Sequence, residues 1–272
     1  MHRSDEPDRR AAGIRLIEAQ PELADGLDPE QAALARRHVV AALETVEPGP
    51  WIPAGFEPRP GSIGLLVIDG VVARDLRIAG RWCSELLGPG DLLRPWDHED
   101  GEAESIATAS AWNVLERTRF AVLDERFARV ACRWPQLMAG LVSRTLRRSR
   151  WMAIMLAISN LTRVDERVVA LMWHLADRWG RVTRDGVVMP VPLTHEMIGK
   201  LVGAHRPSVT SALGELQREG TLARQDGGWV LHGQPPRRLD ENGNPARLRD
   251  RATAVIDPSF VAALLPLAAV FG

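Results

Sequence analysis

Between residues 205 and 214, one long cation stands among short hydroxyl side chains. Arg206 shares a predicted helix face with Ser208, Thr210 and Ser211, while the apolar residues of this stretch recur at spacings of three and four on the opposite face. A guanidinium offers a planar fork of donors that fits a guanine edge, and hydroxyl groups hydrogen-bond phosphate oxygens. This composition predicts a helix that enters a groove of DNA, and it indicates recognition rather than covalent chemistry.

Two short helices must cross to present that face. Thr194 stands at the N-cap of a helix expected over residues 195–202, because its hydroxyl can accept free amides of the first turn. Gly199 leaves room at the crossing point, and Gly203 can adopt the positive φ that ends the helix and reverses the chain. The second helix is expected shortly afterwards, with Pro207 in its first turn. The alternative is a plain helical hairpin that uses the same apolar stripe for packing.

Turn signals flank the two helices on both sides. Asp226-Gly227-Gly228 separates two short extended runs after the second helix, and Asp185-Gly186 forms a similar turn before the first. Asp-Gly pairs between such runs are strong signals for β-hairpins. Strand pairs on both sides of two crossing helices predict a winged helix-turn-helix domain.

With these motifs, the chain resembles the cyclic-AMP receptor protein/FNR superfamily of bacterial transcription regulators, from about residue 14 to residue 233. The resemblance extends to IGLLVIDGVVARDL and WCSELLGPGDLL, which match strands and turns of the family's effector barrel. Within them lies the turn Leu87-Gly88-Pro89-Gly90-Asp91. The implied fold is of the α+β class, with an N-terminal cyclic-nucleotide-binding-like β-barrel (jelly roll), a long dimerisation helix and a C-terminal winged helix-turn-helix.

The resemblance also implies a division of the chain. A helical lead is expected over residues 1–45, the barrel effector domain over 46–133, the dimerisation helix over 134–160, the DNA-binding domain over 161–233, and a linker with an apolar C-terminal extension over 234–272. On the long helix, one face groups five apolar residues along which two copies could pair: Leu137, Leu141, Trp151, Met155 and Ile158. The arginines of residues 144–184 either flank the DNA groove or solvate the outer side of this helix.

For DNA binding, the resemblance implies a homodimer on a palindromic operator in double-stranded DNA, with half-sites about 34 Å apart. Arg206 matches the position that reads a guanine through O6 and N7. Thr194, His205 and Ser208 match positions that contact phosphates, which fix register without carrying sequence information. For His205, a solvated surface role is the alternative.

Two positions depart from the best-known family members. Pro207 stands where an acidic base reader is common, and Ser211 stands where a second arginine is common. We therefore expect a different operator preference, with Ser211 still among the DNA-contacting residues. RNA polymerase is the further partner that the resemblance implies. The alternative function is a ligand or redox sensor that acts through protein contacts without specific DNA binding.

The effector site departs further from the family pattern. AESIATA has no arginine where Arg-Ser-Ala is usual, and Met152 and Ala153 stand where the long helix normally offers polar contacts to adenine. A buried phosphate needs a cation or amides to replace its water, and Arg94 is the candidate cation. Trp96 either lines an apolar pocket for a flat ligand or fills the barrel core. The expected effector-binding residues are Arg94, Trp96 and Met152; no cofactor is assigned, and cyclic AMP is not expected in its usual mode.

Composition narrows the class of protein. The 272 residues suffice for two domains with separate cores, and the formal net charge of −1 requires any DNA-binding positive surface to be local. Two cysteines, Cys83 and Cys132, are too few for the four-thiolate iron–sulfur cluster of the family's oxygen sensors, and they fit a reduced cytoplasmic protein. No apolar run is long enough to cross a membrane.

Catalytic chemistry is not expected. The sequence shows no nucleophile with a plausible base, no phosphate loop and no metal quartet. The acidic run at residues 97–104 contains one histidine, but neighbouring residues of one loop rarely converge on a metal without a distant ligand. A solvated loop is the preferred interpretation, so neither catalytic nor metal-binding residues are assigned.

Overall fold

The computed structural model describes residues 12–53, 60–96, 106, 108–225 and 227–235. The chain divides into two compact units. The first holds residues up to 152 except 82–84, and the second holds those three residues together with residues from 153 onward. The long helix α4 (Pro135–Ser159) begins in the first unit and ends in the second.

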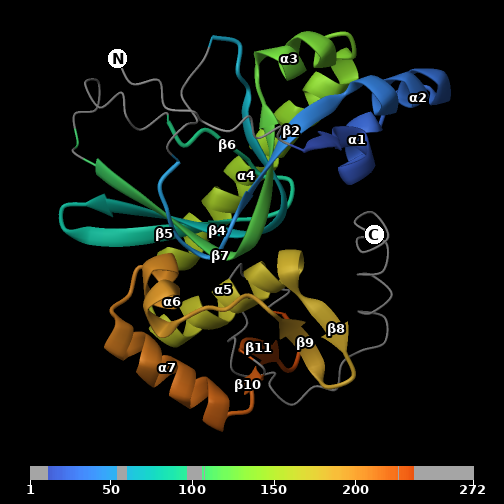
Figure 1. Cartoon of the computed structure of the whole chain (residues 1–272). Coiled ribbons are helices and arrows are strands. Elements are labelled where there is room, and N and C mark those ends of the chain that lie inside the picture. The colour runs from blue at the N-terminus through green and yellow to red at the C-terminus, as the bar shows by residue number, and fades with distance from the viewer. Residues whose placement is uncertain (1–11, 54–59, 97–105, 107, 226, 236–272) are drawn as a thin grey trace, which may run out of the picture. The chain divides into compact units, whose positions relative to one another are not determined.

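The first unit is built on one antiparallel sheet of seven strands (Figure 1). Its hydrogen-bonded order is β1-β2-β7-β4-β5, with β3 paired to β7 and β6 paired to β4. The strands are β1 (Gly13–Arg15), β2 (Val40–Val46), β3 (Gly49–Trp51), β4 (Gly64–Ile78), β5 (Arg81–Leu87), β6 (Leu92–Leu93) and β7 (Thr108–Leu123). The predicted jelly-roll class is confirmed, although the strand path among the described residues is open rather than a closed ring.

The predicted turn between β5 and β6 is confirmed by its hydrogen bonds. The Gly88 amide donates to Asp91 Oδ2 at 2.9 Å, and the Asp91 amide donates to the Gly88 carbonyl at 3.0 Å. Gly90 has a φ of 87°, which a residue with a side chain rarely adopts. The Asp91 side chain therefore closes the turn from within.

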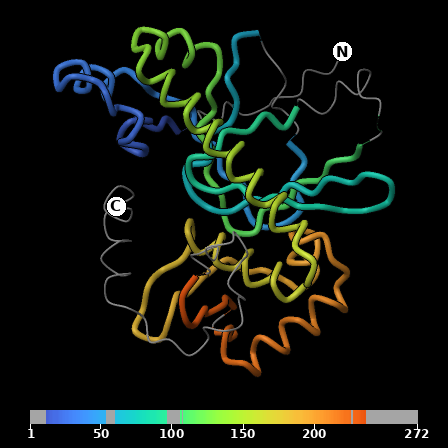
Figure 2. Tube along the Cα trace, turned by 180° about the vertical axis from the view of Figure 1, so that it is seen from behind, coloured from blue at the N-terminus to red at the C-terminus, as the bar shows by residue number. Residues whose placement is uncertain are grey.

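Short helices flank the sheet. They are α1 (Leu16–Ala19), the 3₁₀ helix η1 (Pro21–Ala24), α2 (Pro29–His38) and α3 (Glu125–Ala131). Asp28 caps α2, because its Oδ1 accepts the Gln31 amide at 2.9 Å. Figure 2 shows α1 and α2 beside α3 and the start of α4, and the indole of Trp134 donates to Gln31 Oε1 at 3.0 Å across this junction.

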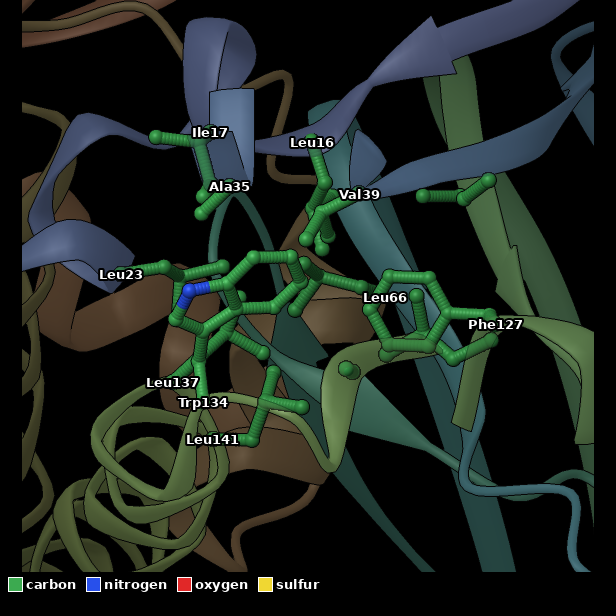
Figure 3. Packing of buried hydrophobic residues seen from close by; sticks show 14 of the residues in the cluster. Leu16, Ile17, Leu23, Ala35, Val39, Leu66, Phe127, Trp134, Leu137 and Leu141 are labelled. Carbon is green, nitrogen blue, oxygen red and sulfur yellow. The ribbon is translucent and has the colours of Figure 1, made fainter. Parts of the chain in front are cut away.

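A shared apolar core holds these helices on the sheet. Figure 3 shows Trp134 beside Leu23 and Leu137, with Leu66 of β4 and Phe127 of α3 in the same cluster. Leu23, Leu66 and Leu137 are each at most 1% exposed. Burying side chains of this size contributes about 1.5–3 kcal/mol each, so the cluster stabilises the unit.

The first 45 residues differ from the predicted helical lead in one respect. β1 and β2 belong to the sheet, and Ala42 of β2 pairs with Val122 of β7. Alanine, leucine and glutamate in residues 40–46 favour a helix locally, but helix propensity is worth only tenths of a kcal/mol per residue. Pairing along β7 outweighs it, so the helix ends at His38 and a strand follows.

The second unit consists of helices and a four-stranded sheet ordered β10-β11-β9-β8 (Figure 1). Its elements are α5 (Val164–Trp179), β8 (Arg181–Thr183), β9 (Gly186–Met189), α6 (His195–Val202), α7 (Arg206–Arg218), β10 (Leu222–Gln225) and β11 (Gly228–Leu231). Both predicted hairpins are present, although Asp226 of the second turn lies outside the described residues. This is the predicted winged helix-turn-helix.

The apolar face proposed for pairing of α4 is wrong. Leu137 is fully buried and Leu141 is 2% exposed, both in the core of Figure 3, and Ile158 is 7% exposed. Trp151 and Met155 are half-buried. A helix of 25 residues has room for two apolar faces, and the sequence alone does not say which one its own chain covers.

Candidate DNA-binding interface

The start of α6 is set by Thr194. Its hydroxyl accepts the Met197 amide at 3.2 Å, as expected for an N-cap, and the residue is exposed. One hydroxyl proton remains to donate to an acceptor outside the chain. The predicted cap is therefore confirmed, while the phosphate contact stays a prediction.

The turn between α6 and α7 depends on two glycines. Gly203 has φ 65° and ψ 37°, the left-handed conformation expected of a residue that ends a helix. At Gly199, an added Cβ would lie 2.7 Å from the carbonyl oxygen of Ala204, which is closer than real Cβ contacts. The Ala204 amide also donates to the Gly199 carbonyl at 2.9 Å. Gly199 thus lies against the backbone of the turn that leads into α7.

Arg167 of α5 fixes the same turn from behind. Its Nη1 donates to the carbonyl of Val202 at 3.3 Å, and its Nε donates to the carbonyl of Leu161. A cation at the C-terminus of α6 satisfies a carbonyl that the helix leaves free and complements the helix dipole. Arg167 therefore has a structural role and is not a groove-flanking cation.

α7 separates its two faces as predicted. Val209, Ala212, Leu213 and Leu216 are each at most 5% exposed and pack toward the rest of the unit. The residues on the other side are exposed, namely Arg206, Pro207, Ser208, Thr210 and Ser211. His205 is the N-cap but makes no side-chain cap hydrogen bond, so its exposed imidazole is not used to start the helix.

The predicted DNA-contacting residues therefore come from two places. Thr194 begins α6, while His205, Arg206, Ser208 and Ser211 lie at the start or on the outer face of α7. All five side chains are exposed. A short polar helix face with one long cation is suited to the major groove, which admits an α-helix.

Sequence reasoning missed the residue that joins the two helices at this surface. His195 Nδ1 lies 3.0 Å from Thr210 Oγ1, although fifteen positions separate the residues. The His195 ring also lies near the buried Trp229 of β11, with ring centroids 6.4 Å apart. A histidine in the first turn of a helix gives no sequence signal of this contact, because only the helix crossing brings it about.

The hairpin of β10 and β11, the wing, places a cation over an aromatic ring. Arg224 of β10 is exposed, its guanidinium carbon lies 4.8 Å from the ring centroid of Trp229, and its Nη1 donates to the Leu193 carbonyl at 3.3 Å. A cation–π contact at an exposed site contributes about 0.5–1 kcal/mol of stabilisation, which helps to hold the arginine side chain in one position. The charge of Arg224 is thus held at the edge of the wing.

Several arginines of residues 144–184 are already engaged. Arg163 donates through Nε and Nη2 to the two carboxylate oxygens of Asp165, at 3.0 and 2.9 Å. Hydrogen bonding to Asp165, and then the attraction of its charge, raise the pKa of Arg163 above its usual value. The guanidinium of Arg178 lies over Trp179 at 4.8 Å. The sequence suggested that these arginines flank the DNA groove or solvate the long helix, and neither alternative includes such contacts within the chain.

Arg144 and Arg148 of α4 face their own chain. Arg144 donates to Glu22 at 3.0 Å, and its side chain is 3% exposed. Arg148 donates to Glu85 at 2.6 Å and to the Leu92 carbonyl at 2.9 Å. Arg74 forms a second ion pair with Glu85 at 2.5 Å. The two cations of α4 thus make contacts within the chain: Arg144 ties the helix to η1, and Arg148 ties it to the sheet.

Of the three candidate effector residues, Arg94 and Trp96 lie next to each other, whereas Met152 is on α4. Trp96 is 7% exposed and belongs to a core cluster with Trp51, Trp112 and Phe120. Trp51 stacks on Phe120 with centroids 5.0 Å apart and meets Trp112 edge to face at 5.8 Å. Of the two interpretations of Trp96, core filling is the one observed. Arg94 is exposed, with its guanidinium 5.8 Å from the Trp96 ring centroid.

Met152 is 38% exposed on α4 and is not part of that aromatic core. The acidic run at residues 97–104 lies outside the described residues. Among the residues that are described, no group of three or more His, Cys, Asp or Glu side chains could hold a metal ion, and the exposed Cys83 and Cys132 are not joined in a disulfide. No helix in the described part of the chain is long and apolar enough to span a membrane.

Comparison with known proteins identifies the class of domain. The family model of the Crp-like helix-turn-helix domain matches residues 166–234. The regulatory protein CysR of Synechococcus elongatus is 29% identical over 101 residues, which are 35% of this chain and 49% of CysR. The match thus spans about half the length of that relative.

Two solved structures show the same fold over most of the chain. A cyclic nucleotide-binding domain containing protein from Listeria monocytogenes has a TM-score of 0.57 and 15% identity, and the match covers 80% of this chain and 97% of that one. A CRP-family transcriptional regulator from Thermus thermophilus has a TM-score of 0.52 and 18% identity, with 79% and 98% covered.

Fold and site thus define a winged helix-turn-helix protein. Residues 166–234 form a Crp-like helix-turn-helix domain, so the resemblance drawn from the sequence is confirmed for that domain. Over most of its length, the chain also shares the fold of the solved CRP-family protein. Two of these relatives carry the names of regulators, a regulatory protein and a CRP-family transcriptional regulator.

Proposed function

We propose that this protein is a transcription regulator that binds a palindromic DNA operator as a homodimer. The observation that carries the proposal is the division of α7 into a buried apolar stripe and an exposed face with Arg206 among short hydroxyl residues. The backbone contact at Gly199 supports it, because it allows the tight turn between α6 and α7 that a helix-turn-helix requires.

Arg206 is the residue that we assign to base reading. It is exposed in the first turn of α7, and the N-terminal part of a recognition helix is the part that meets base edges. A bidentate bond to guanine O6 and N7 is worth about 1–3 kcal/mol of discrimination against another base. Thr194, His205 and Ser208 are assigned to phosphates, and Ser211 to the groove floor beside Arg206.

Homodimer formation is supported by an apolar stripe on the outward face of α4. Val142 is 58% exposed, and Leu146 and Leu156 are each 65% exposed. Together with Ser149 and Ala153 they follow spacings of four, three, four and three, which is the pattern of a two-stranded coiled coil. A second copy of the same helix is the partner that such a stripe fits, and a two-fold dimer requires an operator with two-fold symmetry.

For the effector, we propose that cyclic AMP is not bound in the usual mode. The aromatic core around Trp96 supports this, because it fills part of the sheet unit with side chains. Arg94 and Met152 stay candidate contacts for an effector of unknown chemistry. RNA polymerase is the expected further partner, and the cytoplasm is the expected location because the operator DNA lies there.

The test is selection from a randomised duplex pool by the purified full chain, without added ligand, at near-physiological salt. We expect the wild type to enrich a palindrome and Arg206→Ala to lose preference at one base pair per half-site. Arg36→Ala is the matched control, since it removes an exposed arginine from α2 in the other unit and should leave the preference unchanged.

Failure would be informative if the protein is shown to be folded and dimeric. Binding without sequence preference that disappears as salt rises would favour the alternative, a sensor that acts through protein contacts. Sequence preference that survives Arg206→Ala would keep the regulator but remove Arg206 as its guanine reader.

A further inference from the structure

The hydroxyl of Thr210 is engaged twice within the chain. Oγ1 donates to the Arg206 carbonyl at 3.0 Å, and it lies 3.0 Å from His195 Nδ1. A hydroxyl group has one proton to give. Since that proton goes to the Arg206 carbonyl, the bond to His195 is satisfied when Nδ1–H donates and Oγ1 accepts.

This arrangement does not depend on the charge of the imidazole. Both the Nδ1–H tautomer of neutral histidine and the imidazolium carry a proton on Nδ1. The His195 ring is held in turn by its place in the first turn of α6 and by Trp229, which is 1% exposed. The His195 side chain, at the start of α6, therefore contacts residues of both α7 and β11.

Two hydrogen bonds restrict the rotation of the Thr210 side chain and occupy its polar group. The residue is nevertheless exposed, on the same side of α7 as Arg206 and one helical turn further along. The group left for contact with a ligand is the γ-methyl. A methyl on a base-reading face is complementary to the C5-methyl of thymine, which only the major groove presents.

We infer that Thr210 is a specificity-determining residue that recognises the methyl group of a thymine close to the guanine read by Arg206, and that His195 is the residue that positions it. The inference rests on the proposed function, because it requires α7 to lie in the major groove. A threonine in a helix divides between two rotamers, and fixing one before binding lowers the entropy that complex formation costs.

The test uses the operator found by selection, with each thymine replaced in turn by uracil, which lacks only the C5-methyl. For the wild type, we expect the dissociation constant to rise about fourfold at one thymine per half-site, the change expected for one buried methyl-sized group. Thr210→Ser keeps the hydroxyl and removes the methyl, so it should bind the thymine and uracil operators equally.

Thr210→Val is the matched variant, because it keeps a methyl group and removes the hydroxyl. It should retain a penalty for uracil, because a methyl group stays at the contact and the helix restricts the rotation of valine. Each comparison is a ratio of two affinities of the same protein, so a change in its stability or active fraction cancels.

The role of His195 is tested through the thymine-to-uracil affinity ratio, which would not change if His195 only stabilised the fold. His195→Phe removes the donor and keeps a ring beside Trp229; the thymine-to-uracil ratio should fall toward one. His195→Asn places an amide N–H close to the position of Nδ1–H and should restore the ratio. If both variants keep the wild-type ratio, His195 does not position Thr210.

The outcomes separate this inference from the proposed function. If the wild type enriches no operator, the proposed function fails before any uracil is introduced. If an Arg206-dependent operator is found but no uracil substitution weakens binding, or Thr210→Ser keeps the full penalty, recognition of a thymine methyl by Thr210 is refuted while the regulator stands.

Discussion

The missing side chain of Gly199 leaves room for the turn between α6 and α7. The Cβ that alanine would add at Gly199 meets backbone, 2.7 Å from the Ala204 carbonyl oxygen, and backbone cannot move aside as a flexible side chain can. By contrast, a Cβ added at Gly214 of α7 has no heavy atom within 4 Å. A side chain would therefore clash with backbone at Gly199 but would find open space at Gly214.

We therefore predict opposite effects of one substitution at these two sites. Gly199→Ala should destabilise the protein by about 1–3 kcal/mol, because it overfills the crossing point. Gly214→Ala should be neutral or stabilising by up to about 1 kcal/mol, the difference in helix propensity. Urea unfolding of both variants measures this, and equal destabilisation would show that packing at the crossing is not limiting.

Phosphate contacts and base contacts should respond differently to mutation. His205→Ala should weaken binding by a similar factor on every duplex, because a phosphate contact carries no sequence information. Arg206→Ala should weaken binding mainly on duplexes with the preferred guanine. Titration of both variants on an operator and on a duplex with that guanine replaced distinguishes the two residues; a sequence-dependent effect at His205 would mean that it also touches a base.

Within the sheet unit, α4 is attached by buried charge as well as by apolar packing. The Glu85 side chain is 8% exposed and faces two cations, Arg74 and Arg148, whose side chains are 16% and 21% exposed. Neutralising Glu85 should destabilise the fold, because the two partly buried arginines would then lack a negative charge beside them. The network links β4, β5 and α4.

Glu85→Gln should accordingly destabilise the protein by about 3 kcal/mol, as expected when one member of a buried ion pair is neutralised. The control is Glu47→Gln, because Glu47 and its partner Arg117 are 71% and 67% exposed, and exposed pairs contribute about 1 kcal/mol at most. Thermal unfolding compares the two. A similar small effect at both positions would mean that water reaches Glu85.

The whole molecule should depend on the outward face of α4 for its oligomeric state. Leu146→Glu puts a charge on the apolar stripe and should produce monomers, with full-operator affinity reduced at least about a hundredfold through the loss of bivalent binding. Ser143→Glu, on a neighbouring exposed face, is the control. Sedimentation and binding assays check both, and a dimeric Leu146→Glu protein would place the dimer contact elsewhere.

The sequence by itself determined the local features of the DNA-binding unit. The Thr194 cap, the left-handed Gly203, the two hairpins and the buried stripe of α7 all follow from interactions among near neighbours. Periodicity and glycine placement report such interactions directly. The resemblance to the family placed the long helix over residues 134–160, and α4 spans Pro135–Ser159.

Only the tertiary structure decided which groups far apart in sequence meet. It placed β1 and β2 in the sheet, turned Leu137 and Leu141 inward, and joined His195 to Thr210. Burial of a helix face and pairing of a strand are set by the surfaces available elsewhere in the chain, and their free energies exceed local propensities. The residue types on either side of a contact between elements therefore do not predict that contact.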